Sequence, residues 1–141
     1  MRIDHVIYAS ADLDGAAARV ERELGLMVRD GGRHEGLGTH NRIAPLGGGY
    51  LELLAVADPK EAAGSEFGRG LMARLARGGD GLLGWAVAVD DVGSVASRLR
   101  TRITTIRRAG LSARLTGLAE AMQEPFLPFF VSRPIGLSRY R

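Results

Sequence analysis

The sequence contains no cysteine, and this absence excludes several kinds of site at once. Without a thiol the chain has no disulfide framework, no cysteine-bound zinc or iron–sulfur cluster, and no thiolate nucleophile. Any metal must therefore be held by histidine, aspartate or glutamate. With 141 residues the chain is long enough to bury a hydrophobic core, so folding needs neither disulfides nor a structural metal.

Long hydrophobic runs are missing as well. No apolar stretch approaches the roughly 20 residues that cross a bilayer, and Met1–His5 lacks the basic and then apolar pattern of a secretory leader. These features predict a cytoplasmic protein with no membrane partner. The 45% hydrophobic and 25% charged residues are typical of one globular domain.

Lysine is also nearly absent, since Lys60 is the only one and all other basic residues are arginine. The formal net charge of +3 raises the question of nucleic-acid binding. The densest arginine group lacks the interleaved aromatic residues on which bases stack. That group comprises Arg98, Arg100, Arg102, Arg107 and Arg108. A solvated basic face is therefore favoured over a nucleic-acid partner.

The start of the chain predicts a strand that leads into a helix. Residues 2–9 are rich in β-branched and aromatic side chains, which is typical of a strand. From Asp12 to Leu24 the apolar residues recur at spacings of three and four, and Gly25 follows as a stop signal. This second segment is predicted to be an amphipathic helix.

The next part of the chain predicts a hairpin followed by helix. Residues 31–38 contain too much glycine for regular structure. Residues 39–46 and 50–56 predict two strands, joined by a turn at 47–49. Residues 58–77 then show helical periodicity.

The opening pattern restarts in the second half of the chain. Residues 5–20 align with residues 84–99 without a gap, and Asp12 meets Asp91 at the start of each helix. Three further strands are predicted at 102–107, 112–118 and 127–131. Each half therefore contains one strand, one helix and about three more strands.

Two such βαβββ modules predict an α+β fold in which paired mixed sheets surround a cleft, each with a helix on its outer face. We assign one domain to residues 1–141. It consists of module one at 1–57, a connecting helical segment at 58–80, module two at 81–133 and a loose tail at 134–141.

Five motifs carry a resemblance to a known family. They are Ile3–Tyr8 with the following Asp12-Leu13, Arg33–Arg42, Gly49–Val56, Gly81–Trp85 and Pro128–Phe130. With the module order, they resemble the glyoxalase-like branch of the vicinal oxygen chelate superfamily. That superfamily includes glyoxalase I, extradiol dioxygenases, and fosfomycin- and bleomycin-resistance proteins. The resemblance covers nearly the whole chain.

The resemblance implies a divalent metal in the cleft, which polarises neighbouring oxygens of a substrate. In metal-dependent relatives the ligands come from the first and last strands of each module. His5 and Glu52 match these positions in module one, and strand alternation allows the two side chains to converge. Module two departs from the pattern, because Gly84 and Ser132 stand where ligands are expected. A third ligand would have to be His40, or His34 on the glycine-rich segment.

Several of these residues have alternative interpretations. Glu52 is flanked by leucines, and an unpaired buried carboxylate is costly. It therefore binds a metal, acts as a general base on a carbon next to a carbonyl, or forms a structural ion pair with an arginine such as Arg42. The candidate substrate-binding residues are His40, Asn41, Trp85 and Phe129.

Two functions follow from the resemblance. The first is a small-molecule metalloenzyme (a lyase, isomerase or dioxygenase) that uses zinc, nickel, manganese or iron on a substrate with vicinal oxygens. The second is a metal-free binding or sequestration protein of the bleomycin-resistance type, with Trp85 and Phe129 as cleft walls. Relatives commonly dimerise, so the resemblance also implies a homodimer.

Overall fold

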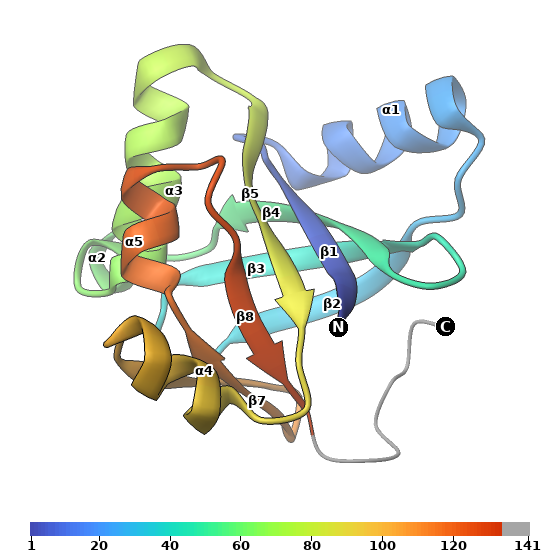
Figure 1. The fold of residues 1–141 in the computed structure, drawn as a ribbon. Coiled ribbons are helices and arrows are strands. Elements are labelled where there is room, and N and C mark those ends of the chain that lie inside the picture. Colours follow the sequence, from blue (N-terminus) through green and yellow to red (C-terminus); the bar gives the residue numbers. More distant parts are fainter. Residues whose placement is uncertain (134–141) are drawn as a thin grey trace.

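The computed structural model describes residues 1–133, and the predicted tail at 134–141 lies outside the described residues. The described chain forms eight strands and five helices (Figure 1). The first half contains β1 (Arg2–Ala9), α1 (Leu13–Leu24), β2 (Arg29–His34), β3 (Thr39–Pro45) and β4 (Tyr50–Val56), followed by α2 (Pro59–Ala63) and α3 (Glu66–Gly78). The second half contains β5 (Gly81–Ala88), α4 (Val92–Leu99), β6 (Ile103–Arg108), β7 (Leu111–Thr116), α5 (Leu118–Gln123) and β8 (Phe129–Ser132).

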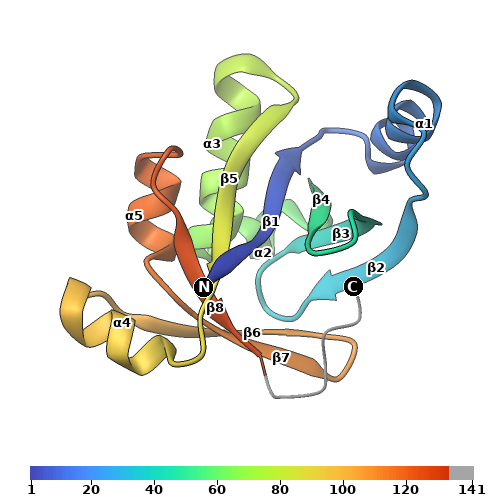
Figure 2. The same ribbon diagram turned by 45° about the vertical axis from the view of Figure 1, so that its right-hand side comes forward.

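All eight strands belong to one curved sheet, in the order β2-β3-β4-β1-β5-β8-β7-β6. Each module pairs its first and last strands in parallel, β1 with β4 and β5 with β8. The antiparallel pair β1–β5 joins the two modules at the centre of the sheet. The two edges curve toward each other (Figure 2), and the backbone N–H of Glu35 donates to the carbonyl of Arg107 at 2.9 Å. The predicted fold class is confirmed, with the two module sheets continuous at β1–β5.

The central ladder supports the internal repeat. The gap-free alignment equates His5 with Gly84 and Ile7 with Ala86. In the β1–β5 ladder His5 lies opposite Ala86, and Ile7 lies opposite Gly84. A local two-fold axis between the strands produces this reciprocal pairing, so residues separated by the alignment offset are structurally equivalent.

The glycine-rich segment was predicted to be irregular, and this prediction was wrong at its start, because β2 includes Gly31, Gly32 and His34. A β-carbon at Gly31 would lie 2.5 Å from the backbone oxygen of Asn41, so only glycine fits against β3 there. The register of the β2–β3 ladder also shifts between Asp30 and Gly32. These glycines thus permit a bulged strand.

Two further elements differ from the sequence prediction. The helix expected over 58–77 is divided into α2 and α3, because Ser65 caps a new helix by accepting from the N–H of Gly68. Helix α5 was not predicted at all. Its partly buried Met122 and buried Ala121 face the core, where α5 packs with α3.

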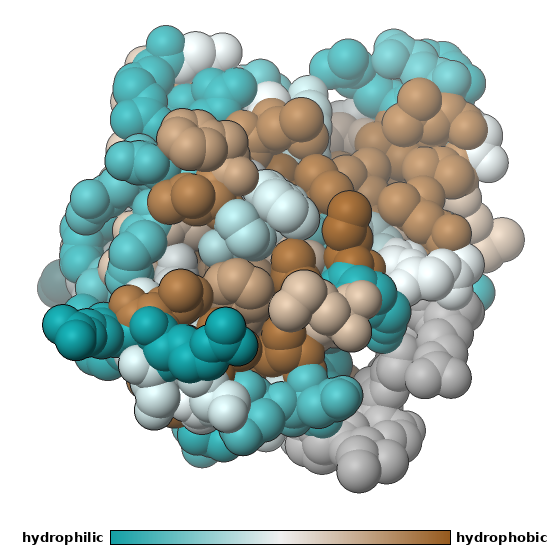
Figure 3. Space-filling model, viewed as in Figure 1, coloured by the Kyte–Doolittle hydropathy of each residue, from teal (hydrophilic) through white to brown (hydrophobic). Residues whose placement is uncertain are grey.

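The main core lies where α3 and α5 cover the face of the sheet that carries Ile7 and Leu54. On the other face, Ala16 and Ala17 of α1 pack against Leu53 of β4. Helices present mostly hydrophilic residues to solvent, while apolar side chains are exposed over the strands between them (Figure 3). None of the helices in the described part of the chain has the length and apolar character that crossing a bilayer requires.

Candidate functional site

A cavity opens on the inner face of the sheet, beside the core under α3 and α5, and the two modules line it differently. Module one contributes a polar wall. That wall contains Asp4, His5, His34, Asn41 and Glu52. The opposite wall is apolar and comes largely from module two. It contains Ile106, Leu115, Leu118, Phe129 and Val131.

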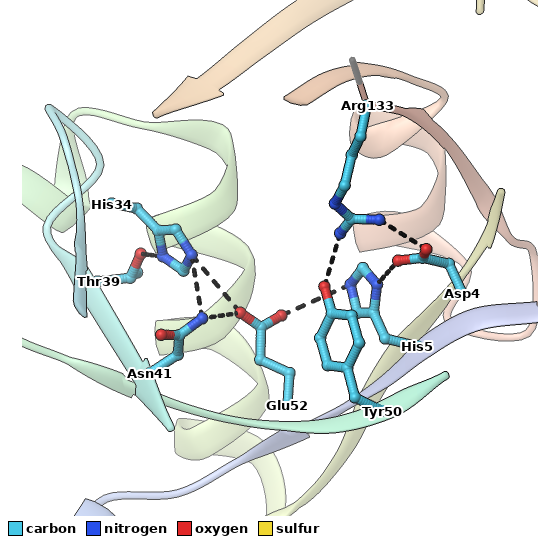
Figure 4. A network of polar contacts seen from close by, with 8 residues as sticks. All are labelled: Asp4, His5, His34, Thr39, Asn41, Tyr50, Glu52 and Arg133. Carbon is cyan, nitrogen blue, oxygen red and sulfur yellow. Dashed lines mark hydrogen bonds and ion pairs between the residues drawn. The ribbon is translucent and has the colours of Figure 1, made fainter. Parts of the chain in front are cut away.

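Glu52 lies at the centre of the polar wall and is only 4% exposed. Its Oε1 is 3.6 Å from Nε2 of His5, and its Oε2 is 3.5 Å from Nε2 of His34. The side-chain amide of Asn41 donates to Oε2 at 2.5 Å. Figure 4 shows the carboxylate between the two imidazoles. The carboxylate is thus paired with buried polar groups and also faces the cavity.

The ring of His5 is held on three sides. Tyr50 stacks on it with ring centroids 4.6 Å apart, and Phe129 presents an edge contact at 5.7 Å. Nδ1 of His5 lies 2.6 Å from Oδ2 of Asp4. An ionised carboxylate only accepts hydrogen bonds, so Nδ1–H donates to Asp4 and Nε2 is the ring nitrogen directed at Glu52.

Asp4 and His5 are consecutive in β1, yet both line the cavity. The β1–β5 register shifts between Ile3 and His5, which breaks the usual alternation of side chains. Burial alone raises the pKa of Asp4, but hydrogen bonds from His5 and Arg133, and their charges, lower it to about 2. Asp4 is therefore ionised at neutral pH and orients His5.

His34 reaches the site from the end of β2. Its Nδ1 lies 2.9 Å from the hydroxyl of Thr39, and its ring contacts the edge of Phe67 at 5.7 Å. Burial lowers the pKa of His34, and the nearby Glu52 opposes this shift only in part. Asn41 is oriented by the same bulged strand, since its Oδ1 accepts from the N–H of Gly32 at 3.1 Å. Both side chains therefore lie in fixed positions beside Glu52.

Arg133 is a site residue that the sequence analysis missed. Its two terminal nitrogens donate to Oδ1 of Asp4 at 2.6 Å and to the hydroxyl of Tyr50 at 2.7 Å. It follows β8, where Phe129 and Val131 alternate with residues of the other face. That alternation extends to position 133 and was the one signal in the sequence that places this arginine in the cavity.

The structure brings together some of the predicted residues and separates others. His5, Glu52, Asn41 and Phe129 all line the cavity. His40 lies on the opposite face of β3, because it is adjacent in the strand to the inward-facing Asn41. Its pKa is lowered by burial and by Arg33 and Arg42.

Two other residues named in the sequence analysis also lie away from Glu52. The indole N–H of Trp85 donates to the carbonyl of Phe126 at 3.0 Å in an exposed position, away from the cavity lining. Arg42 pairs with Asp14 and Asp30 on the outer side and does not reach Glu52. A strand side chain faces one side of the sheet only, and tertiary pairing decides which.

The polar wall does not fit a divalent ion as it is arranged. Its donors are suitable in kind, but His5 and His34 approach different oxygens of Glu52 from opposite sides, and Asn41 already occupies Oε2 (Figure 4). Among the described residues, no group of three or more histidine, aspartate or glutamate side chains is positioned to hold a metal ion.

Module two adds no ligand. Ile7 lies opposite Glu52 in the β1–β4 ladder. Ala86, which corresponds to Ile7 in module two, lies opposite Phe129 in the β5–β8 ladder. Phe129 therefore stands at the module-two position that corresponds to Glu52, where a carboxylate ligand was expected. The expectation that Ser132 stands there was wrong by this register. Gly84 stands at the module-two position that corresponds to His5. A β-carbon there would lie 3.7 Å from Met122 of α5, so this helix covers the position.

Comparisons with known proteins agree with this geometry. A family model described as a glyoxalase-like domain matches residues 3–135. A structure of Streptomyces coelicolor methylmalonyl-CoA epimerase is 26% identical, with a TM-score of 0.72, over 94% of this chain and 97% of that chain. The Mycobacterium tuberculosis methylmalonyl-CoA epimerase is 21% identical, with a TM-score of 0.72, over 94% and 88% of the two chains. A hypothetical protein from Bacillus halodurans C-125 is 13% identical, with a TM-score of 0.72, over 94% of both chains.

A search of curated proteins found no match. The family match spans nearly the whole chain and coincides with the two-module sheet, the central β1–β5 pair and the cavity. The chain therefore belongs to the glyoxalase-like domain family, within the vicinal oxygen chelate superfamily.

Proposed function

We propose that this protein is a small-molecule enzyme of the superfamily that moves a proton at a carbon next to a carbonyl group, with Glu52 as the base. The observation that carries the proposal is the buried Glu52 carboxylate, which faces a partly apolar cavity between two imidazoles. A base placed in this way needs only hydrogen-bond reach of the substrate proton.

The solved neighbours support this class of reaction. The Streptomyces coelicolor epimerase described above holds 2-nitronate-propionyl-CoA. Another methylmalonyl-CoA epimerase, 26% identical with a TM-score of 0.73 over 95% of both chains, holds methylmalonyl-CoA and an ammonium ion. Epimerisation inverts a carbon centre, and next to a carbonyl it proceeds most simply by removal and return of a proton.

The proposed step needs no co-reactant. The carbon–hydrogen bond breaks, the proton passes to the carboxylate of Glu52, and the electron pair moves toward the carbonyl oxygen to form an enolate. Return of the proton to carbon regenerates Glu52 and yields an epimer or a positional isomer. His5, held by Asp4 through Nδ1, offers Nε2 as a second site that can accept and return a proton.

The other cavity residues prepare this step. The side-chain amide of Asn41 donates to Oε2 of Glu52, and this hydrogen bond fixes the direction of the other carboxylate oxygen. Phe129 and Leu115 are nearly inaccessible and form a dry wall opposite the base. Exclusion of water strengthens the electrostatic interactions between the base and the developing enolate.

The test is hydrogen exchange in D₂O, followed by proton NMR. A panel of 2-substituted carbonyl compounds, which includes 2-oxo acids and methylmalonyl-CoA, is incubated with the protein. We expect one class to lose its α-proton signal, and Glu52→Gln to slow that exchange at least 100-fold. Glu21→Gln, on the exposed surface of α1, is the matched control. An unchanged exchange rate in Glu52→Gln would show that another group is the base.

A second candidate function is metal-free binding or sequestration of a small molecule. The replacement of the module-two ligand positions by Gly84 and Phe129 favours it, because these residues shape a wall and supply no chemistry. Under this alternative a compound binds in the cavity with no exchange and no turnover. Its affinity would then depend on Phe129 and not on the ionisable group of Glu52.

A further inference from the structure

We propose that the ligand of this cavity is a carboxylic acid with an apolar body, whose carboxylate is received by Arg133 and Arg108 and whose body lies against the module-two wall. The inference rests on the proposed function, since the same cavity holds Glu52, and it specifies the substrate class.

The first argument for an anionic ligand is the charge of the residues that line the cavity. Among residues 1–133, three arginines (Arg2, Arg108 and Arg133) and two acidic residues (Asp4 and Glu52) line the cavity. Asp4 is already engaged by both His5 and Arg133. Cations gathered around one partly buried cavity repel one another, and an incoming anion relieves that repulsion.

The second argument is the geometry of Arg133, which is oriented to bind a carboxylate. Asp4 and Tyr50 fix the plane of its guanidinium, and its side chain is 27% exposed. The group has five N–H donors in a rigid fork, and among residues 1–133 its hydrogen bonds to Asp4 and Tyr50 use two of them. An arginine that is oriented before binding loses little entropy when it holds a planar carboxylate.

Arg108 reaches the same cavity from the end of β6, which is an edge strand of the sheet. It is half-buried, and its aliphatic stem packs close to Gly32 of β2. Its charge lowers the pKa of His34, so the guanidinium lies near the polar wall. Two arginines of module two, one at the end of β6 and one just after β8, therefore lie on the lining of one cavity.

The apolar wall identifies the rest of the ligand. The apolar wall consists of Ile106, Leu115, Leu118, Phe129 and Val131, and Phe67 of α3 also lines the cavity. This wall offers few hydrogen-bond partners to a polar ligand such as a sugar. A branched aliphatic or aromatic body buries apolar surface there, and removal of that surface from water favours binding.

The carboxylate can belong to a free acid or to a thioester that carries one, and the experiment separates these sources. Isothermal titration calorimetry measures binding of 3-phenylpropanoate, 4-methylpentanoate, 3-phenylpropanamide and methylmalonyl-CoA to the full chain. We expect at least one acid to bind at least 10-fold more tightly than the amide. Tight binding of methylmalonyl-CoA alone would assign the carboxylate to a thioester. Equal binding of acid and amide, with no binding of methylmalonyl-CoA, would overturn the proposal.

Variants test the assigned arginines. Arg108→Gln and Arg133→Gln should each weaken binding of the preferred carboxylate at least 10-fold, while Arg107→Gln, exposed on the same strand as Arg108, should change it less than twofold. Arg108→Gln decides the matter if loss of the Asp4 partner prevents Arg133→Gln from folding. Wild-type affinity in both arginine variants would overturn the assignment.

The proposal and the proposed function fail separately. If carboxylates bind and no compound exchanges its α-proton, the substrate class stands and the enzymatic function is wrong. If neutral carbonyl compounds exchange through Glu52 and carboxylates show no preference, the enzymatic function stands and the substrate class is wrong.

Discussion

Glu52 and Phe129 occupy equivalent positions in the two modules of the sheet. Ile7 pairs with Glu52 in the parallel β1–β4 ladder, and the equivalent Ala86 pairs with Phe129 in the parallel β5–β8 ladder. One module thus directs a carboxylate into the cavity where the other directs a phenyl ring. This single difference separates the polar wall from the apolar wall and places any proton chemistry on module one.

Loss of the Phe129 ring should destabilise the protein. Phe129 is 2% exposed and contacts both the main core and His5. We expect Phe129→Ala to lower the free energy of unfolding by about 3 to 5 kcal/mol, because the ring leaves a cavity. Urea denaturation measures this, with Phe126→Ala as the control, since Phe126 is 73% exposed. Equal effects of the two substitutions would contradict the assignment of Phe129 to the core.

Asp4 should make stability depend on pH in the acid range. Its pKa is about 2 in the folded protein against an ordinary value of 3.8, so the folded state holds the ionised form more strongly. The stabilisation is complete above pH 3.8 and is lost as the pH falls toward 2, with a total of about 2 kcal/mol. Urea denaturation between pH 2 and 5 should show a slope below pH 3.8 that Asp4→Asn removes. The exposed Asp90→Asn should leave the slope intact.

His34 should stay neutral at a pH where an ordinary histidine is charged. Burial lowers its pKa from 6.5, and Glu52 partly opposes the shift. The associated stability is therefore complete above pH 6.5 and falls as the pH drops below that value. NMR titration of the imidazole signals measures this pKa. In Glu52→Gln the pKa should fall further because the opposing carboxylate charge is gone, and a rise would contradict the assigned contact.

Metal content tests the arrangement of the polar wall. Because the two imidazoles approach different oxygens of Glu52, we expect less than stoichiometric zinc, nickel, manganese or iron after incubation with these ions and dialysis. Elemental analysis of the wild-type protein and of His5→Ala measures it. One equivalent of metal that disappears in His5→Ala would show that the donors rearrange around an ion.

The N-caps of α1 and α4, which are equivalent in the repeat, should stabilise their helices to different extents. Asp12 accepts from the N–H of Gly15 at 3.1 Å, whereas Asp91 forms no side-chain cap bond at the start of α4. We expect Asp12→Ala to cost about 1 kcal/mol of unfolding free energy. Asp91→Ala should cost clearly less in the same urea denaturation experiment. A larger loss in Asp91→Ala would reverse the assignment of the caps.

Local patterns were enough for much of the fold. The spacing of apolar residues and the Asp12 and Gly25 signals predicted α1. The β-branched and aromatic content of residues 2–9 and the hairpin pattern that includes residues 50–56 predicted β1 and β4 with the observed bounds. The gap-free repeat predicted the two modules. The first part of the glycine-rich segment was wrongly predicted to be irregular. Its glycines allow β2 to lie close to Asn41 on β3, and a local sequence pattern does not show such a contact.

The sequence by itself determined the two strands on which His5 and Glu52 lie. The family resemblance, together with strand alternation, led to the prediction that the two side chains converge. Only the tertiary structure decided their companions. His40 and Asn41 are neighbours on β3, and pairing with β4 turns Asn41 inward and His40 outward. Arg133 reaches Asp4 across almost the whole length of the chain. Such contacts depend on register and sheet curvature, which arise from packing of the entire fold, so a local pattern does not show which side chains meet.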